Sequence, residues 1–212
     1  MKRDEALDRI LSLKVIAVIR MSDPEKLFSV TEAIKRGGVK AIEITLTTPG
    51  ALDVIREMSA KKSPDVLIGA GTVLDAETAD AAIDAGAEFV VSPVTNFDMI
   101  QVCRRRDTFV APGAFTPTEI VAAWKQGADV VKVFPATSLG PKYFKDLKGP
   151  LPQIRLMPTG GVSLENAADF IKNGACCVAI GTALLDQKSI ERNDWEALTA
   201  KAAALVESLR GI

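Results

Sequence analysis

Two charged residues occupy positions where the surrounding sequence predicts buried strands. Lys132 lies within DVVKVFPA (residues 129–136), whose β-branched and aromatic residues are typical of a packed strand that ends at Pro135. Glu43 lies within GVKAIEIT (residues 38–45), a second apolar run. Because an unpaired buried charge costs several kcal/mol, we interpret both residues as functional.

The chemistry open to this pair is covalent catalysis on a carbonyl compound. Burial disfavours the ammonium form of Lys132, which lowers its pKa and frees the amine to form a Schiff base with a ketone. The iminium then withdraws electrons from the adjacent carbon, and the carboxylate of Glu43 can move the protons. The alternative is a buried ion pair with a structural role only, but apolar residues often replace such pairs without loss of stability.

Histidine is absent from the chain. Catalysis by Ser-His-Asp, Cys-His or His-zinc sites is therefore excluded. The three cysteines, Cys103, Cys176 and Cys177, do not have the spacing of a metal-ligand set. We expect neither a metal nor another cofactor.

Glycine-rich segments form a candidate anion site. PTGGVS (158–163) contains Gly160 and Gly161, and AIGTAL (179–184) contains Gly181 and Thr182. Glycines let backbone N–H groups approach an anion, and the loops after the last two strands of a β/α barrel commonly bind phosphate. A tight turn is an equally good explanation of Gly160 and Gly161 taken alone.

Arg20 and Thr72 each follow an apolar run. They are either ordinary polar groups at strand ends or ligands, since arginine pairs with carboxylate or phosphate and a threonine hydroxyl can assist.

A weak internal repeat supplies the elements that must position these residues. In each copy an amphipathic helix ends at a glycine and an apolar strand follows; the copies are GVKAIEIT, GAEFVVSP, GADVVKVFP and GACCVAIG. Four further apolar runs lie between them: VIAVIR, VLIGAG, TFVAPG and IRLMPTG. Eight strands alternating with helices predict an α/β fold, a (β/α)₈ TIM barrel, with an open doubly wound sheet as the alternative.

Position within the repeat predicts where the charges meet. The fifth residue after each glycine is Glu43, Val91, Lys132 or Ala179. Inward residues of alternate strands share a layer in such a barrel, so Glu43 and Lys132 should face each other, with Ala179 leaving room. The odd spacing turns Asp129 away from Lys132, and we expect it at a solvent-exposed strand start.

Three helix starts carry candidate side-chain caps in the sequence. They are Asp23 before Pro24, Thr116 with Glu119, and Thr95 with Asp98.

Composition bounds the class of protein. The 212 residues are 48% apolar without an internal break, which predicts one domain over 1–212: an N-terminal segment (1–13) whose helix crosses the bottom of the barrel, a core at about 14–185 and a C-terminal helix at about 190–210. A net charge of −1 does not favour nucleic acid. The amphipathic N-terminus is neither a signal peptide nor a membrane span, and the cysteine usage predicts the cytoplasm.

The ordered motifs AVIR, GGVKAIEITLTTP, IGAGTV, GAEFVVSP, KVFPA and PTGGV resemble the 2-keto-3-deoxy-6-phosphogluconate (KDPG) aldolases, which include the 4-hydroxy-2-oxoglutarate (KHG) aldolases. The resemblance covers about residues 14–185. It implies a metal-independent class I aldolase, usually a homotrimer, that cleaves KDPG to pyruvate and D-glyceraldehyde 3-phosphate, and KHG to pyruvate and glyoxylate.

The resemblance also implies roles for single residues. Lys132 matches the Schiff-base lysine, Glu43 the proton-shuttling glutamate, and Thr72 a residue that holds the pyruvate carboxylate. The phosphate loops match Thr159, Gly160, Gly161, Gly181 and Thr182. The hydroxyl of Thr159 is similar to members specific for the gluconate isomer.

One position departs from the family pattern. Some members bind the carboxylate with an arginine where this chain has Thr47, whereas others carry an arginine at the end of the first strand, as Arg20 does. The resemblance therefore implies that Arg20 acts with Thr72 on the carboxylate.

Two other interpretations stay open at this level. One is a phosphate-binding barrel isomerase or synthase in which Lys132 is only a fixed charge. The other is a non-catalytic barrel that binds a sugar phosphate as a sensor or scaffold.

Overall fold

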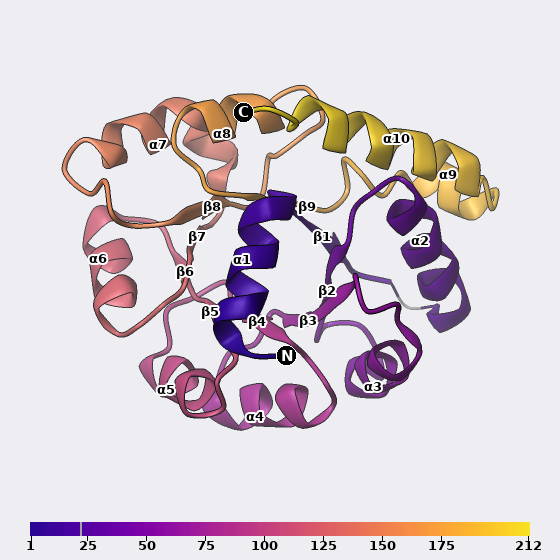
Figure 1. Cartoon of the computed structure of the whole chain (residues 1–212), viewed down its shortest axis with the longest axis horizontal. Coiled ribbons are helices and arrows are strands. Elements are labelled where there is room, and N and C mark those ends of the chain that lie inside the picture. The colour runs from indigo at the N-terminus through magenta and orange to yellow at the C-terminus, as the bar shows by residue number, and fades with distance from the viewer. Residues whose placement is uncertain (22) are drawn as a thin grey trace.

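The computed structural model describes residues 1–21 and 23–212, with the side chains of all of these except residues 24 and 25. Its helices are α1 (Arg3–Leu13), α2 (Pro24–Arg36), α3 (Ala51–Lys61), α4 (Ala76–Asp84), α5 (Phe97–Arg105), α6 (Pro117–Lys125), the 3₁₀ helix η1 (Ala136–Ser138), α7 (Gly140–Lys148), α8 (Ala167–Lys172), α9 (Gln187–Glu191) and α10 (Trp195–Ser208). Its strands are β1 (Val15–Ile19), β2 (Ala41–Thr45), β3 (Leu67–Gly71), β4 (Phe89–Val91), β5 (Phe109–Ala111), β6 (Gly113–Ala114), β7 (Val131–Val133), β8 (Leu156–Pro158) and β9 (Val178–Ile180). Figure 1 shows the helices outside the curled strands, with α1 lying across one end.

The predicted α/β class is confirmed, with every paired strand parallel. Six strands form one sheet in the order β5-β4-β3-β2-β1-β9, and three form another in the order β6-β7-β8. The described chain has nine strands and not the predicted eight, because the run TFVAPG is divided into β5 and β6 at Pro112. Proline has no N–H to donate to a ladder, so pairing is interrupted there.

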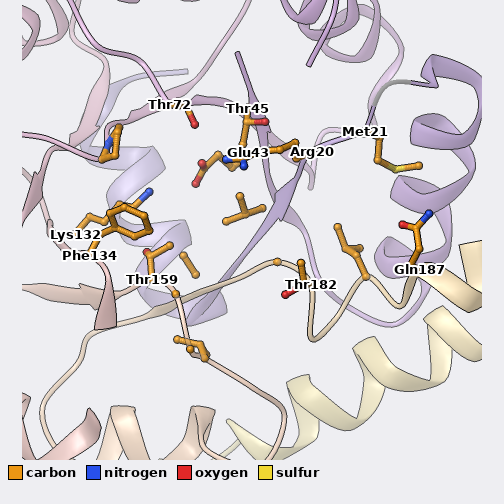
Figure 2. A pocket seen from close by; sticks show the side chains of 18 of the residues that line it. Arg20, Met21, Glu43, Thr45, Thr72, Lys132, Phe134, Thr159, Thr182 and Gln187 are labelled. Carbon is orange, nitrogen blue, oxygen red and sulfur yellow. The ribbon is translucent and has the colours of Figure 1, made fainter. Parts of the chain in front are cut away.

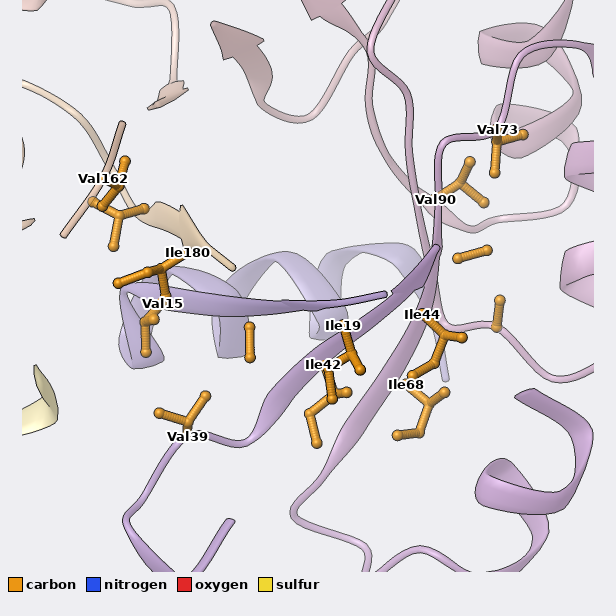
Figure 3. Close-up of a cluster of buried hydrophobic side chains, with 14 of the residues drawn as sticks. Val15, Ile19, Val39, Ile42, Ile44, Ile68, Val73, Val90, Val162 and Ile180 are labelled. Carbon is orange, nitrogen blue, oxygen red and sulfur yellow. The ribbon is translucent and has the colours of Figure 1, made fainter. Parts of the chain in front are cut away.

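Two apolar layers flank the strands, as strand alternation requires. Along β1, Val15, Ala17 and Ile19 belong to the large outer cluster packed under the helices, while Ile16 belongs to a smaller inner cluster. Figure 3 shows outer residues of β1, β2 and β3, among them Ile19, Ile42 and Ile68.

The same alternation orients β7. Val131 and Val133 lie in the outer cluster and Val130 in the inner one. Lys132 therefore points to the inner face, as predicted.

The glycine of each repeat copy ends its helix in the same way. Gly38, Gly86, Gly127 and Gly174 have φ of 95°, 103°, 100° and 103°. In each copy the glycine N–H donates to the carbonyl three residues back, and the following N–H donates to the carbonyl five residues before it. These paired bonds form a Schellman motif, which explains the recurrence of glycine in the sequence.

The expected exposure of Asp129 is wrong. Its side chain is buried, accepts a hydrogen bond from Val110 N at 2.9 Å and forms an ion pair with Arg3 of α1 at 3.3 Å. The start of β7 thus lies beneath α1, whose predicted place across the end of the strands brings a cation to this carboxylate.

Helix ends correct two further expectations. Thr116 and Glu119 form the predicted capping box, but the N-cap of α5 is Asn96, which accepts from Met99 N, while Thr95 donates to Gly113 O. The C-terminal helix expected at about 190–210 corresponds to α10, which begins only at Trp195, because Asn193 adopts a left-handed φ of 55° and Asp194 caps the helix; the short α9 precedes it.

Within the described ranges, the helices are too short or too polar to traverse a lipid bilayer.

Candidate active site

One cavity of about 420 Å³ opens where the strands end, and it is lined by all nine site residues predicted from the sequence. Arg20 follows β1, Thr72 follows β3, Thr159 to Gly161 follow β8, and Gly181 and Thr182 follow β9. Glu43 and Lys132 enter from the inner faces of β2 and β7. Parallel strands bring residues distant in sequence to one rim, so the sequence could predict the grouping.

Glu43 and Lys132 point toward each other in this cavity (Figure 2). The side chain of Glu43 is fully buried and the residue Lys132 is 5% exposed. Neither carboxylate oxygen of Glu43 has a hydrogen-bond partner among the described residues. The pair is therefore not a self-satisfied structural bridge, the alternative considered from the sequence, and it has unused capacity to bind a ligand.

Burial shifts both groups toward their uncharged forms. Desolvation raises the pKa of Glu43, opposed by the positive charges of Lys132 and Arg20. Desolvation lowers the pKa of Lys132, opposed by Glu43 and reinforced by Arg20. The Lys132 Nζ also lies 5.1 Å from the centroid of the Phe134 ring, whose face attracts a cation.

Thr72 is held in an unusual backbone conformation. Its φ is 59°, a left-handed value that a β-branched residue rarely adopts. Such strain persists where the surroundings impose it and is common at functional sites. Here it places a threonine directly after β3, at the edge of the cavity.

The glycine loop after β8 is built around two left-handed residues. Gly160 and Gly161 have φ of 81° and 74°, and a Cβ on Gly161 would lie 2.7 Å from Thr137 Cα. The Asn166 side chain braces the loop through bonds to Ser163 N and Gly161 O. Thr159 contributes a buried hydroxyl whose oxygen has no hydrogen-bond partner in the described chain. Both glycines are thus needed for the shape of a loop that borders the cavity.

Sequence reasoning missed several residues of the cavity wall. Thr45 lies two residues after Glu43, so alternation could have placed it on the same face; its Oγ1 lies 3.0 Å from Thr47 Oγ1. Met21, Gln187 and Ile190 also line the cavity, and no motif in the sequence identified them.

The chain matches the family model described as KDPG and KHG aldolase over residues 7–201. It is 39% identical over 184 residues to a 2-dehydro-3-deoxy-phosphogluconate aldolase of Pseudomonas aeruginosa, covering 86% of this chain and 83% of the relative. It is 31% identical over 197 residues to the KHG/KDPG aldolase of Escherichia coli, covering 92% of each.

A solved structure of a KDPG aldolase also resembles this chain. The KDPG aldolase of Legionella pneumophila, with pyruvate captured at low pH as a covalent carbinolamine intermediate, superposes with a TM-score of 0.86 at 27% identity, covering 94% of this chain and 97% of that one. The family model matches nearly the whole length of the chain, and the cavity brings a lysine and a glutamate together. The chain therefore belongs to the KDPG and KHG aldolase family.

Proposed function

We propose that this protein is a class I aldolase that cleaves KDPG to pyruvate and D-glyceraldehyde 3-phosphate through a Schiff base on Lys132. The observation that carries the proposal is the buried amine of Lys132 facing the unpartnered carboxylate of Glu43 in the cavity. Membership of the aldolase family supports it, as does the carbinolamine of the Legionella relative.

The reaction follows from the protonation states that the site favours. The uncharged amine of Lys132 attacks the C2 ketone to give a carbinolamine, which loses water to form the iminium. Removal of the proton from the C4 hydroxyl then breaks the C3–C4 bond, releasing the aldehyde and leaving an enamine. Protonation at C3 and hydrolysis give pyruvate and regenerate the amine, with Glu43 relaying the protons through water.

The rest of the cavity wall binds the two ends of the substrate. Arg20 and Thr72 hold the carboxylate, and Thr159, Gly160, Gly161, Gly181 and Thr182 hold the phosphate. The same steps cleave KHG to pyruvate and glyoxylate, a second substrate that the name of the Escherichia coli relative supports.

We further propose that the two sheets form one closed (β/α)₈ barrel within a single domain over 1–212. A parallel bridge between Thr159 and Ala179 joins β8 to β9. At the other junction, Asp129 N donates to Val110 O and Lys132 N to Pro112 O.

A homotrimer is proposed on the evidence of an apolar patch at the same rim. Leu74, Val94, Phe97 and Phe115 are each at least 40% exposed. They lie close together, since Asn96 bonds to Leu74 O and Thr95 to Gly113 O. Exposed apolar clusters of this kind commonly mark subunit contacts.

Three free cysteines suit the reducing cytoplasm, which we propose as the location.

Borohydride reduction with pyruvate tests the mechanism. We expect a pyruvyl adduct on Lys132, located by peptide mass spectrometry, and pyruvate release from KDPG that persists after chelator treatment. Lys132→Ala should abolish both. Turnover of a sugar phosphate without an adduct would favour the isomerase or synthase, and thermal stabilisation by sugar phosphates without pyruvate release would favour the non-catalytic barrel.

A further inference from the structure

Gly71, the last residue of β3, is a glycine that the backbone does not require. It lies within a strand and lacks the positive φ of the loop glycines. A glycine inside a strand is less favourable than alanine by about 0.5–1 kcal/mol. Its presence therefore calls for a reason other than conformation, and the reason is space.

The space beside Gly71 is filled by Glu43. On the paired strands Glu43 is in register with Gly69 and Thr45 with Gly71, so the glutamate side chain extends along β3 toward the rim. A Cβ on Gly71 would lie 2.5 Å from Glu43 Cγ, and nearer still to its Cδ and Oε1. Normal contact between carbon atoms is about 3.5–4.0 Å, so the methyl group and the carboxylate cannot occupy these positions together.

We infer that Gly71 is a positioning residue: its missing side chain lets the Glu43 carboxylate lie where it relays protons. This inference rests on the proposed role of Glu43. The group that conflicts with a methyl at position 71 is the end of a flexible side chain, so the fold can tolerate alanine by rotating Glu43 away. Gly69 differs, because a Cβ there would meet the ring of the buried Phe89, a core residue.

Proton exchange at the methyl group of pyruvate measures the proton relay by Glu43 separately from carbon–carbon cleavage. The wild-type chain should exchange the C3 protons of pyruvate for deuterium, followed by NMR, and Gly71→Ala should lower that rate about 100-fold, within the range expected for loss of a general acid–base. Its borohydride adduct on Lys132 should still accumulate on long incubation, at a half-saturating pyruvate concentration within about threefold of wild type, since the amine and the carboxylate ligands are untouched. The melting temperature should also be close to that of wild type.

Glu43→Ala and the double variant Gly71→Ala/Glu43→Ala form the matched controls. Truncating Glu43 removes the three atoms nearest to the added methyl, so the double variant should exchange no more slowly than Glu43→Ala alone. If Gly71→Ala fails to fold, recovery of folding in the double variant supports the inference, and its absence overturns it.

Two results would contradict the role of Gly71: wild-type exchange in Gly71→Ala, or losses that multiply in the double variant. Failure of the proposed function is distinguishable, because the wild-type chain would then form no adduct and exchange no protons.

Discussion

At the residue scale, three charges set the protonation of the site. Arg20 lowers the pKa of both Glu43 and Lys132, and so favours the carboxylate and the free amine, the two states that Schiff-base chemistry needs. Glu43 acts on Lys132 in the opposite direction and raises its pKa. The reactivity of Lys132 thus depends on two neighbours whose effects have opposite sign.

Replacing Glu43 and replacing Arg20 should shift the pKa of Lys132 in opposite directions. Glu43→Gln removes a negative charge, so the pKa of Lys132 should fall; Arg20→Gln removes a positive charge, so it should rise. The rate of acylation of Lys132 by acetic anhydride across pH, read by peptide mass spectrometry, measures both shifts. Arg20→Lys keeps the charge and serves as control; shifts of the same sign in the two variants would show that this electrostatic account is wrong.

Thr72→Gly should separate stability from binding. A left-handed φ costs a residue other than glycine about 1–2 kcal/mol. Glycine does not have this cost, but it loses about 0.5–1 kcal/mol through the greater conformational entropy of the unfolded chain. We expect the free energy of unfolding to stay level or rise, while KM for the 2-keto acid rises about tenfold through loss of a hydrogen bond to a charged group.

Asp107→Gly, at another left-handed position outside the cavity, should preserve stability and leave KM unchanged. A marked loss of stability in Thr72→Gly would mean that the backbone at Thr72 is not strained.

At the element scale, the ion pair between Arg3 and Asp129 connects α1 to the start of β7, whereas the cavity lies where the strands end. Burial raises the pKa of Asp129, and the hydrogen bond from Val110 and the charge of Arg3 oppose the rise. Because the native pKa lies above the unfolded value, the native state binds more protons than the unfolded state between the two. The contribution of this group to stability therefore falls as pH rises through that interval.

Arg3→Ala should consequently cost more stability at pH 7 than at pH 4. Loss of the cation raises the native pKa of Asp129 further, and the carboxylate is charged and uncompensated only at the higher pH. We expect a loss of about 1–3 kcal/mol at pH 7 in urea unfolding, and unchanged kcat. Asp4→Ala, which removes the exposed partner of Arg3, is the control and should have little effect at either pH. An equal cost at both pH values would argue against the ion pair as the anchor.

At the scale of the whole molecule, the apolar patch and the cavity share one rim. Pro93 lines the cavity and the adjoining Val94 belongs to the patch, so the proposed subunit contact and the proposed active site use neighbouring residues. In the proposed trimer, a neighbouring subunit would therefore lie close to the cavity.

Phe97→Glu combined with Phe115→Glu should dissociate the proposed trimer. A charge on each protomer in an apolar contact is desolvated without a partner, which costs several kcal/mol per contact. Light scattering after size-exclusion chromatography should change from three chains to one, and Arg192→Glu on another exposed surface should leave three. A wild-type chain that elutes as a monomer would remove the basis of the proposal.

Local pattern was sufficient to locate the apolar strand runs and the glycine turns, and to predict that the candidate site residues line one cavity, but it missed the division of one run into β5 and β6. It was insufficient where a distant segment decides the outcome. The spacing of Asp129 in its own strand predicts exposure, but distant segments bury it: Arg3 of α1 forms an ion pair with it, and Val110 N donates a hydrogen bond to it. Thr95 and Asn96 are both residue types that cap helices well. Because Thr95 donates its hydroxyl hydrogen bond to Gly113 O of β6, Asn96 caps α5 instead.

The four Schellman turns recur along the chain, and a strand begins shortly after the glycine of each. Glu43, Val91, Lys132 and Ala179 are then equivalent positions, two of them charged and two apolar. In the closed barrel that we propose, Glu43 and Lys132 lie on opposite sides, two repeat copies apart. The other two equivalent residues, Val91 and Ala179, lie in the inner cluster, so in the proposed barrel a lysine and a glutamate at these positions would face each other one repeat copy away from the native pair.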